Sequence, residues 1–155
     1  MIEGLEFLRG KPFYDIIRRW YEGDPTVSTI ATYTGMTVVS TEPGRAVLTL
    51  EARRELANVG GTLHGGIITT VADCALSTAL VGTLGEGESF ASIEMKINFL
   101  KAARGLLTFE GRILQRGRTI AYGECSVTDA AGRLVARISS FMAVLQARPD
   151  GADGS

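Results

Sequence analysis

Cysteine, histidine and excess charge are all scarce in this chain of 155 residues. Two cysteines and one histidine are too few for a disulfide framework or a zinc site. The net charge is −1, and the chain has no lysine- or arginine-rich block of the kind that binds nucleic acid. We therefore expect no metal, no disulfide and no nucleic-acid partner.

The chain also lacks the uninterrupted apolar run that a secretory signal or a membrane span needs. Its first residues include early acids and no apolar stretch, unlike a signal peptide. The most apolar region, 67–84, is interrupted by Asp73, Gly82 and several threonines, so it is too polar and too short to cross a bilayer. With 45% hydrophobic and 21% charged residues, the composition is that of one soluble globular domain, which we expect in the cytoplasm.

Hydrophobic periodicity and turn residues divide the chain into two helices and six strands. Apolar residues at i, i+3, i+4 and i+7, starting at Phe13, mark one face of a short amphipathic helix. Shorter apolar or alternating runs, separated by glycine-containing links, are typical of strands. The predicted helices cover about 12–22 and 64–84, and the predicted strands cover 33–41, 45–51, 90–100, 106–115, 120–129 and 134–145.

The links between the last four predicted strands are short. Short links favour antiparallel neighbours, because a parallel crossover needs a dozen or more residues. The sequence therefore predicts an α+β fold in which one antiparallel sheet wraps around one long helix. We divide the chain into an N-terminal helical segment and lead-in at 1–32, a main domain at 33–147 and a polar tail at 148–155, which we expect to be disordered.

The region from Leu56 to Gly85 contains one acid, Asp73, and no lysine or arginine. A carboxylate inside an apolar helix costs folding energy unless it is paired or hydrogen-bonded. Asp73 is therefore either an acid that activates water or a structural acid that caps a neighbouring backbone. Thr70 and Ser77 share its helical face and are possible hydrogen-bond partners.

The same region begins with the glycine-rich segment NVGGTLHGG at 58–66, which contains the only histidine, His64. A glycine-rich turn that leads into a helix presents unpaired backbone N–H groups at the positive end of the helix dipole. These groups can hold an oxyanion, although the glycines are also explained by a tight turn. Together with Asp73, the segment indicates a site that binds an oxyanion and activates water.

The strand predicted at 90–100 alternates between apolar and polar residues. The odd-numbered residues from Ala91 to Phe99 are apolar and should pack on the helix, while the even-numbered residues from Ser92 to Asn98 are polar. Ser92 is therefore expected on the face away from the helix. It can join a site on the helix only across a subunit boundary or through a local bulge.

Three segments, in this order and spacing, resemble the hotdog-fold acyl-CoA thioesterases, in the branch of the phenylacetyl-CoA thioesterases and thioesterase superfamily member 2. They are Asn58 with HGG at 64–66 and an acid nine positions after His64, FASIEMKINFL at 90–100, and QRGRT at 115–119. The resemblance covers about residues 33–146. It implies a hotdog fold, in which a curved sheet wraps a central helix, and an acyl-CoA substrate that is hydrolysed without a cofactor.

The resemblance also implies roles for individual residues, in a site between the subunits of a dimer or tetramer. The N–H of Gly65 polarises the thioester carbonyl with help from Asn58, because preorganised donors contribute most where negative charge develops. Asp73 acts as general base or nucleophile, and Ser92 helps to hold the water. From the sequence alone, Asn58 is almost as well explained as an Asx-turn residue, and His64 as a residue that shapes the helix entry.

For the coenzyme A part of the substrate, the resemblance implies contacts around the helix entry, the end of the strand at 90–100 and the link at 116–118. The substrate-binding residues expected from it are His64, Gly66, Phe99, Leu100, Arg116, Gly117 and Arg118. Guanidinium groups fit phosphate geometry, although charged residues are also normal in an exposed hairpin link.

The sequence thus predicts an acyl-CoA thioesterase and leaves the acyl group open. The alternative is a non-catalytic acyl-CoA-binding hotdog protein, a sensor or carrier, against which the set of Asp73, Asn58 and Gly65 argues. A dehydratase is a weaker alternative, because it needs a histidine paired with the acid in a different spacing. A long strand with one apolar face would associate with other chains if it were left as an unpaired sheet edge, so we expect a homodimer or homotetramer.

Overall fold

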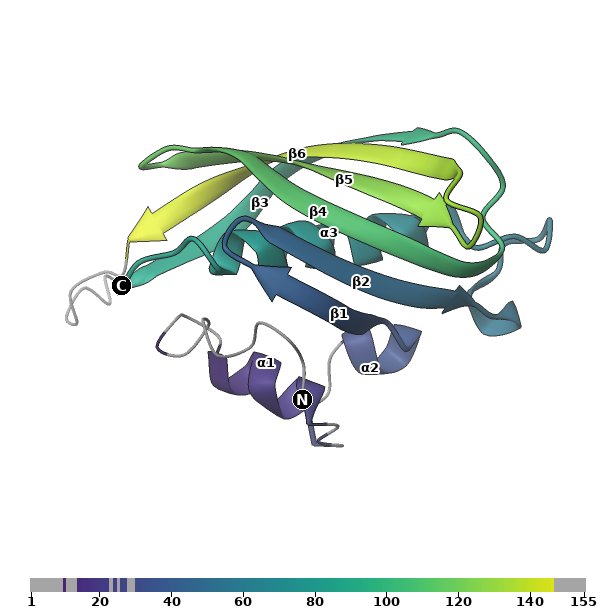
Figure 1. The fold of residues 1–155 in the computed structure, drawn as a ribbon, viewed down its shortest axis with the longest axis horizontal. Helices are drawn as coiled ribbons and strands as arrows, with labels where there is room; N and C mark the ends of the chain where they lie inside the picture. Colours follow the sequence, from purple (N-terminus) through teal and green to yellow (C-terminus); the bar gives the residue numbers. More distant parts are fainter. Residues whose placement is uncertain (1–9, 11–13, 23, 25, 28–29, 147–155) are drawn as a thin grey trace, which may run out of the picture.

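The computed structural model describes residues 10, 14–22, 24, 26–27 and 30–146 of the chain. Two short helices, α1 (Tyr14–Tyr21) and α2 (Ile30–Thr34), precede a sheet that curls around the long helix α3 (Gly65–Val81) (Figure 1). A 3-10 turn, η2 (Arg54–Leu56), follows the second strand. The strands are β1 (Thr37–Glu42), β2 (Arg45–Ala52), β3 (Glu88–Phe99), β4 (Gly105–Arg116), β5 (Ile120–Asp129) and β6 (Leu134–Gln146).

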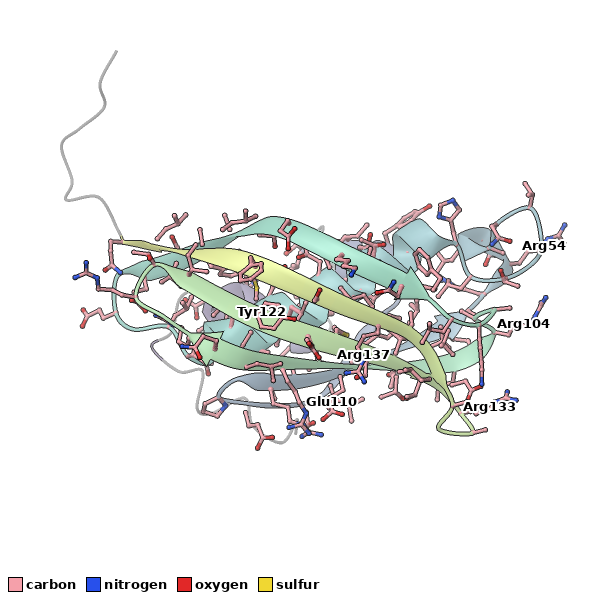
Figure 2. The ribbon with its side chains drawn as sticks, turned by 90° about the horizontal axis from the view of Figure 1, so that it is seen from above. Arg54, Arg104, Glu110, Tyr122, Arg133 and Arg137 are labelled. Atoms are coloured by element: carbon pink, nitrogen blue, oxygen red, sulfur yellow. The ribbon has the colours of Figure 1, made fainter. Side chains whose placement is uncertain are left out.

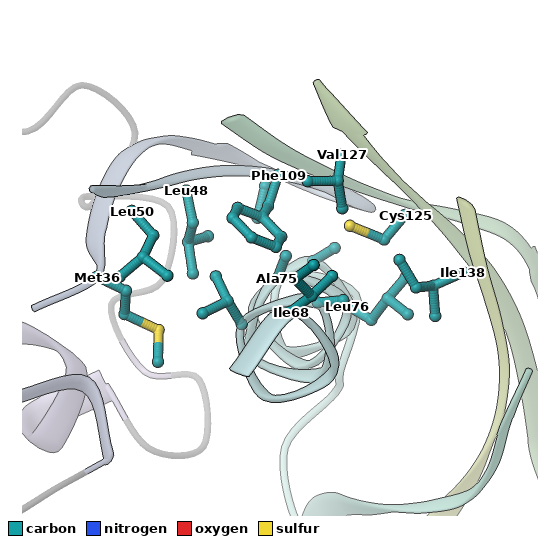
Figure 3. Close-up of a cluster of buried hydrophobic side chains, with 14 of the residues drawn as sticks. Met36, Leu48, Leu50, Ile68, Ala75, Leu76, Phe109, Cys125, Val127 and Ile138 are labelled. Carbon is teal, nitrogen blue, oxygen red and sulfur yellow. The ribbon is translucent and has the colours of Figure 1, made fainter. Parts of the chain in front are cut away.

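The six strands form one sheet in the order β1-β2-β4-β5-β6-β3, and all neighbours are antiparallel. Inward-facing side chains such as Leu48, Phe109 and Ile138 pack around Ala75 and Leu76 of α3, and all five are fully buried (Figure 3). The predicted α+β hotdog fold is therefore confirmed. The two edge strands of this sheet are β1 and β3, so among the described residues β3 has no strand neighbour on one side.

The close fit of helix and sheet explains a glycine in β4. A Cβ atom added at Gly111 would lie 2.8 Å from the backbone of Ala75 in α3. A real Cβ cannot approach a backbone so closely, so the helix would have to move away from the sheet.

The outer face of the sheet, by contrast, carries polar and charged side chains. Seen from above, Glu110, Tyr122 and Arg137 stand on β4, β5 and β6 (Figure 2). Alternation of buried and outward residues along these strands is what a sheet with one covered face requires.

The start of β1 differs from the prediction. A strand was expected from Tyr33, but residues 30–34 form α2 and the strand begins at Thr37. The Thr34 hydroxyl donates to the carbonyl of Ile30 at 2.9 Å, which stabilises the helical turn. Gly35 then ends the turn with a φ of +75°, a left-handed conformation that glycine adopts without strain.

The long helix is shorter than predicted at its C-terminal end. It ends at Val81 rather than near Leu84, with Gly82 as its C-cap. The N–H and hydroxyl of Thr83 both bond to the carbonyl of Leu80 at 2.8 Å, so the chain turns away from the helix axis. Within the described residues, no helix is both long and apolar enough to cross a membrane.

The N-terminal helix is found inside its predicted range. Ile16, Ile17 and Trp20 lie on α1, whereas Phe13, predicted on the same face, and the tail predicted at 148–155 lie outside the described residues. Ile17 and Trp20 pack against the core as half-buried side chains. The boundary drawn between 32 and 33 falls inside α2.

A β-bulge interrupts β3 at Ile93. Ser92 pairs with Met142 of β6, and Glu94 pairs with the next residue back, Phe141, so Ile93 is an extra residue without a partner. A bulge of this kind shifts the alternation of side chains by one position.

The bulge changes which side chains of β3 face the helix. Phe90 packs against the core before it, and Met95 and Ile97 pack against the core after it. The prediction that all odd-numbered residues face the helix is therefore wrong for Ala91, which is exposed, and for Ile93, which is 55% exposed. The same shift turns the even-numbered Ser92 toward α3.

Candidate active site

Asp73 and Ser92 meet within one chain. Asp73 lies in the middle of α3, and the Ser92 hydroxyl donates a hydrogen bond to Asp73 Oδ1 at 2.8 Å. Of the two routes that the sequence left open for Ser92, the structure therefore shows the local bulge.

The other hydroxyl groups on that face of α3 do not compete for Asp73. The Thr70 hydroxyl donates to the carbonyl of Gly66 at 2.9 Å. Ser77, one turn beyond Asp73, lines a cavity beside it. Among the described residues, no arginine or lysine forms an ion pair with Asp73, so the hydroxyl of Ser92 is the group that orients this carboxylate.

Cys74 is the other potential nucleophile in this part of α3. Burial and, to a smaller extent, the neighbouring charge of Asp73 raise the pKa of its thiol to about 11. A thiol with this pKa stays protonated near pH 7 and is a poor nucleophile. Burial likewise raises the pKa of Cys125 to about 12, so Asp73 is the better candidate for the chemistry.

The start of α3 carries one open backbone donor. His64 is the N-cap, and its Nδ1 accepts a hydrogen bond from the N–H of Gly66 at 2.9 Å. The N–H of Gly65 has no acceptor among the described residues, as expected for the first residue of a helix. The ring of Phe99 lies against Gly65, where an added Cβ would be 3.0 Å from Phe99 Cζ. Gly65 thus has a free donor, while that of Gly66 is occupied.

Asn58 shapes the loop before α3. Its Oδ1 accepts from the N–H of Gly60 at 2.9 Å and from the N–H of Thr62 at 3.3 Å. Its Nδ2 donates to the Thr62 hydroxyl at 2.9 Å. These bonds form an Asx turn, the alternative that the sequence left open, and they leave one hydrogen of Nδ2 for a ligand.

The oxyanion donor and the acid are far apart in one chain. Gly65 and Asp73 are eight residues apart on α3, which corresponds to about 12 Å along the helix axis. A donor and a base that act on the same carbonyl each lie within about 3 Å of the reacting atoms or of one water. One chain therefore brings Ser92 to Asp73 but does not bring Gly65 to them.

The predicted coenzyme A contacts lie at both ends of α3. Near its start, Phe99 and Leu100 are each 54% exposed, and His64 is exposed. These residues form an open surface beside the free N–H of Gly65, as a ligand contact requires.

At the opposite end, the two arginines of the β4–β5 link differ. The Arg116 guanidinium is bonded to the carboxylate of Glu88 and to the carbonyl of Gly117, and its Nε is buried. Arg118 is exposed and has no partner among the described residues. A Cβ at Gly117 would lie 2.9 Å from the carbonyl oxygen of Ile120, so the turn itself requires glycine there. Of the two, Arg118 is the arginine that is free to meet a phosphate.

Glu88 anchors this end of β3. Its carboxylate accepts hydrogen bonds from the N–H of Gly85 at 2.8 Å, from Arg116, and from Gln146 Nε2 at 3.1 Å. These bonds lower the pKa of Glu88 to about 2. Sequence reasoning missed this cluster, because its members are far apart along the chain.

Sequence reasoning also missed an apolar cavity of about 220 Å³ that lies between α1, α2, α3 and β3. Its lining includes Ile16, Ile17 and Trp20 of α1 and Cys74, Ser77 and Val81 of α3. The sequence contained part of the signal for this cavity, because it predicted an apolar face on the N-terminal helix. It did not indicate which part of the chain that face packs against. Within the described residues, no cluster of three metal-ligating side chains is found.

Comparison with known proteins agrees with this fold. The model of the thioesterase superfamily matches residues 60–136. A putative esterase of Saccharolobus solfataricus is 34% identical over 112 residues, which are 72% of this chain and 79% of that protein. Acyl-coenzyme A thioesterase 13 of Homo sapiens is 30% identical over 105 residues, which are 66% of this chain and 74% of that protein.

A solved thioesterase family protein from Silicibacter pomeroyi superposes with a TM-score of 0.75 and 25% identity, over 86% of this chain and 98% of that one. The family match covers α3, β3, β4 and β5, the part of the chain in which Gly65, Asp73 and Ser92 lie. The chain belongs to the thioesterase superfamily and is a thioester hydrolase.

Proposed function

We propose that the protein is an acyl-CoA thioesterase that converts an acyl- or aryl-CoA to the free acid and coenzyme A. The observation that carries the proposal is the 2.8 Å hydrogen bond from Ser92 to Asp73, the single acid of a helix in a thioesterase fold. Coenzyme A thioesters as the substrate class are supported by the relative named acyl-coenzyme A thioesterase 13.

In the proposed reaction, Ser92 holds Asp73 and the attacking water in place. The water oxygen attacks the thioester carbonyl carbon while a proton passes to the Asp73 carboxylate. The negative charge that forms on the carbonyl oxygen is stabilised by the N–H of Gly65, with the remaining Nδ2 hydrogen of Asn58 as a second donor. The carbon–sulfur bond then breaks, and the proton passes from Asp73 to the departing thiolate.

The separation of Gly65 from Asp73 supports a site built from two copies of the chain. In this proposal, Asp73 and Ser92 of one subunit face Gly65 and Asn58 of the other. The free edge of β3 supplies a surface for such pairing, because unpaired strand edges bind other strands. A homodimer is sufficient to bring these residues of two chains together. The pairing of dimers into a homotetramer and the cytoplasmic location stay predictions.

The first experiment separates the enzyme from a non-catalytic sensor or carrier. Release of free thiol is followed for acetyl-, octanoyl-, palmitoyl- and phenylacetyl-CoA with the purified protein. We expect turnover of at least one of these thioesters, and we expect Asp73→Asn to lower that turnover by about two orders of magnitude or more. Binding of all four without release of thiol would support the carrier instead.

The second experiment tests the site between subunits. Gly65→Pro removes the N–H, and proline is well tolerated at the first position of a helix. Removal of one oxyanion donor lowers kcat by about 10²–10³. Gly65→Ala is the matched control, because it adds a Cβ beside Phe99 but keeps the N–H.

Mixing two inactive variants then locates the partners. When Asp73→Asn and Gly65→Pro chains are unfolded and refolded together, each mixed dimer contains one intact site and one site with both defects. Random pairing should restore about a quarter of wild-type activity. If the refolded mixture is no more active than the two variants measured separately, the site lies within one chain.

A further inference from the structure

The apolar cavity is lined by residues that are close to Asp73 and Ser92 in the chain, although these two do not line it themselves. Cys74 follows Asp73 in the chain, and Ser77 is one turn further along the same face of α3. Phe90 precedes Ser92 by two residues on the face of β3 that packs on the core. One end of the cavity is therefore next to the position at which the carbonyl carbon of a substrate would react.

The N-terminal helices cover the cavity. Ile16, Ile17 and Trp20 of α1 and Ile30 and Ala31 of α2 line it from the side opposite α3. All five precede residue 60, where the match to the family model begins. None of the described residues that line the cavity carries a charge, so a charged group would lose its hydration there without compensation.

We propose that this cavity holds the acyl group of the substrate and that α1 and α2 limit the length of that group; this inference rests on the proposed thioesterase function. The lining of α3 runs from Cys74 to Val81, about 10 Å along the helix. Tetrahedral carbon–carbon bonds advance about 1.25 Å per atom, so an extended chain of about eight carbons spans this distance.

The volume leads to the same class of acyl group. An engineered cavity of about 150 Å³ in another protein binds benzene. The cavity of about 220 Å³ found here has room for a phenyl ring with its linking carbon, or for a medium-length chain. The preferred substrates are thus medium-chain acyl-CoA and arylacetyl-CoA thioesters, with apolar acyl groups.

Burial of the chain gives a length dependence that can be measured. Each methylene group moved from water into an apolar site is expected to raise kcat/KM about fourfold. The value should rise from acetyl-CoA to about octanoyl-CoA and stop rising once the cavity is filled.

Trp20 offers a readout that does not depend on turnover, because it is the only tryptophan of the chain and lines the cavity. The probes are S-octyl-CoA and S-ethyl-CoA, two thioethers that cannot be hydrolysed, together with coenzyme A. We expect S-octyl-CoA to shift the tryptophan emission, and S-ethyl-CoA and coenzyme A to leave it unchanged.

Variants at the mouth of the cavity complete the test. Ile16 and Ile30 are 52% and 48% exposed, so Ile16→Lys and Ile30→Lys should fold normally. Each places a charge against the acyl chain, and we expect each to lower the ratio of kcat/KM for octanoyl-CoA to that for acetyl-CoA at least tenfold. Asp15→Asn is the matched control, because it changes the net charge equally on an exposed position of α1 outside the cavity.

The outcomes separate this inference from the proposed function. Hydrolysis with an unchanged ratio in both lysine variants and an unresponsive Trp20 would overturn the cavity as the acyl site and leave the thioesterase intact. A shift of the Trp20 emission by S-octyl-CoA without hydrolysis of any thioester would overturn the thioesterase and support the cavity as an acyl-binding site.

Discussion

Replacement of Asp73 by asparagine tests the centre of the proposed mechanism. The amide has nearly the same shape, and its Oδ1 still accepts the hydrogen bond from Ser92. It cannot take a proton from water, so we expect kcat to fall by about two to four orders of magnitude. The free energy of unfolding should change by less than about 1 kcal/mol, because no ion pair is lost and a partly buried charge is removed.

A second aspartate provides the matched control. In the β5–β6 hairpin, Asp129 accepts hydrogen bonds from the backbone of Ala131 and Arg133 at 3.0 Å and from Arg133 Nε at 2.8 Å. Asp129→Asn weakens these bonds, so the melting temperature should fall while kcat stays the same. The assay is release of coenzyme A thiol, with melting followed by circular dichroism. A folded Asp73→Asn protein with near-wild-type turnover would remove Asp73 from the mechanism.

Three further predictions concern the neighbours of the site. Ser92→Ala removes one hydrogen bond to Asp73, so kcat should fall about tenfold, whereas Ser139→Ala on the outer face of β6 should leave it unchanged; steady-state kinetics on both variants checks this. Arg118→Ala should raise KM for an acyl-CoA several-fold but not for a short thioester without the nucleotide, and equal losses on both would indicate a structural role. The pKa of Glu88 is lowered from 4.5 to about 2, so its contribution to stability is full above pH 4.5 and is lost as the pH falls toward 2. Glu88→Gln should therefore make the melting temperature less dependent on pH over this acidic range, and an unchanged dependence would refute the lowered pKa of Glu88.

The regular elements could be predicted because each has a strong local signal. The strand predicted at 120–129 has the bounds found in the structure, since glycine-containing links flank it on both sides. Antiparallel pairing of β4 with β5 and of β5 with β6 followed from their short links. The prediction is wrong for β3 and β4, which are also joined by a short link but are not neighbours, because β3 pairs with β6 and β4 with β2. The helix start was predicted at about 64 from the glycine-rich turn before an apolar run, and in the structure His64 is the N-cap and Gly65 the first helical residue.

Other parts of the fold depend on contacts that no local pattern records. Residues 30–34 read IATYT, a composition rich in β-branched and aromatic side chains that favours a strand, yet they form α2. Ala31 and Thr34 of α2 are buried against the rest of the chain, and this packing outweighs the propensity. The role of Arg116 was likewise hidden, because its partner Glu88 is 28 residues away in sequence.

The position of Ser92 shows why the site could be predicted only as alternatives. A period of two in the sequence gives the face of each residue only while the pairing is regular, and Ile93 adds a residue that no pattern of apolar and polar positions reveals. The bulge directs Ser92 inward to Asp73 on the strand whose outer edge is free. In the proposed dimer, the edge that pairs the two subunits and the residue that orients the acid thus belong to the same strand. Separation of the subunits would remove Gly65 of the partner and the support of β3 together, so activity and association should be lost at the same protein concentration.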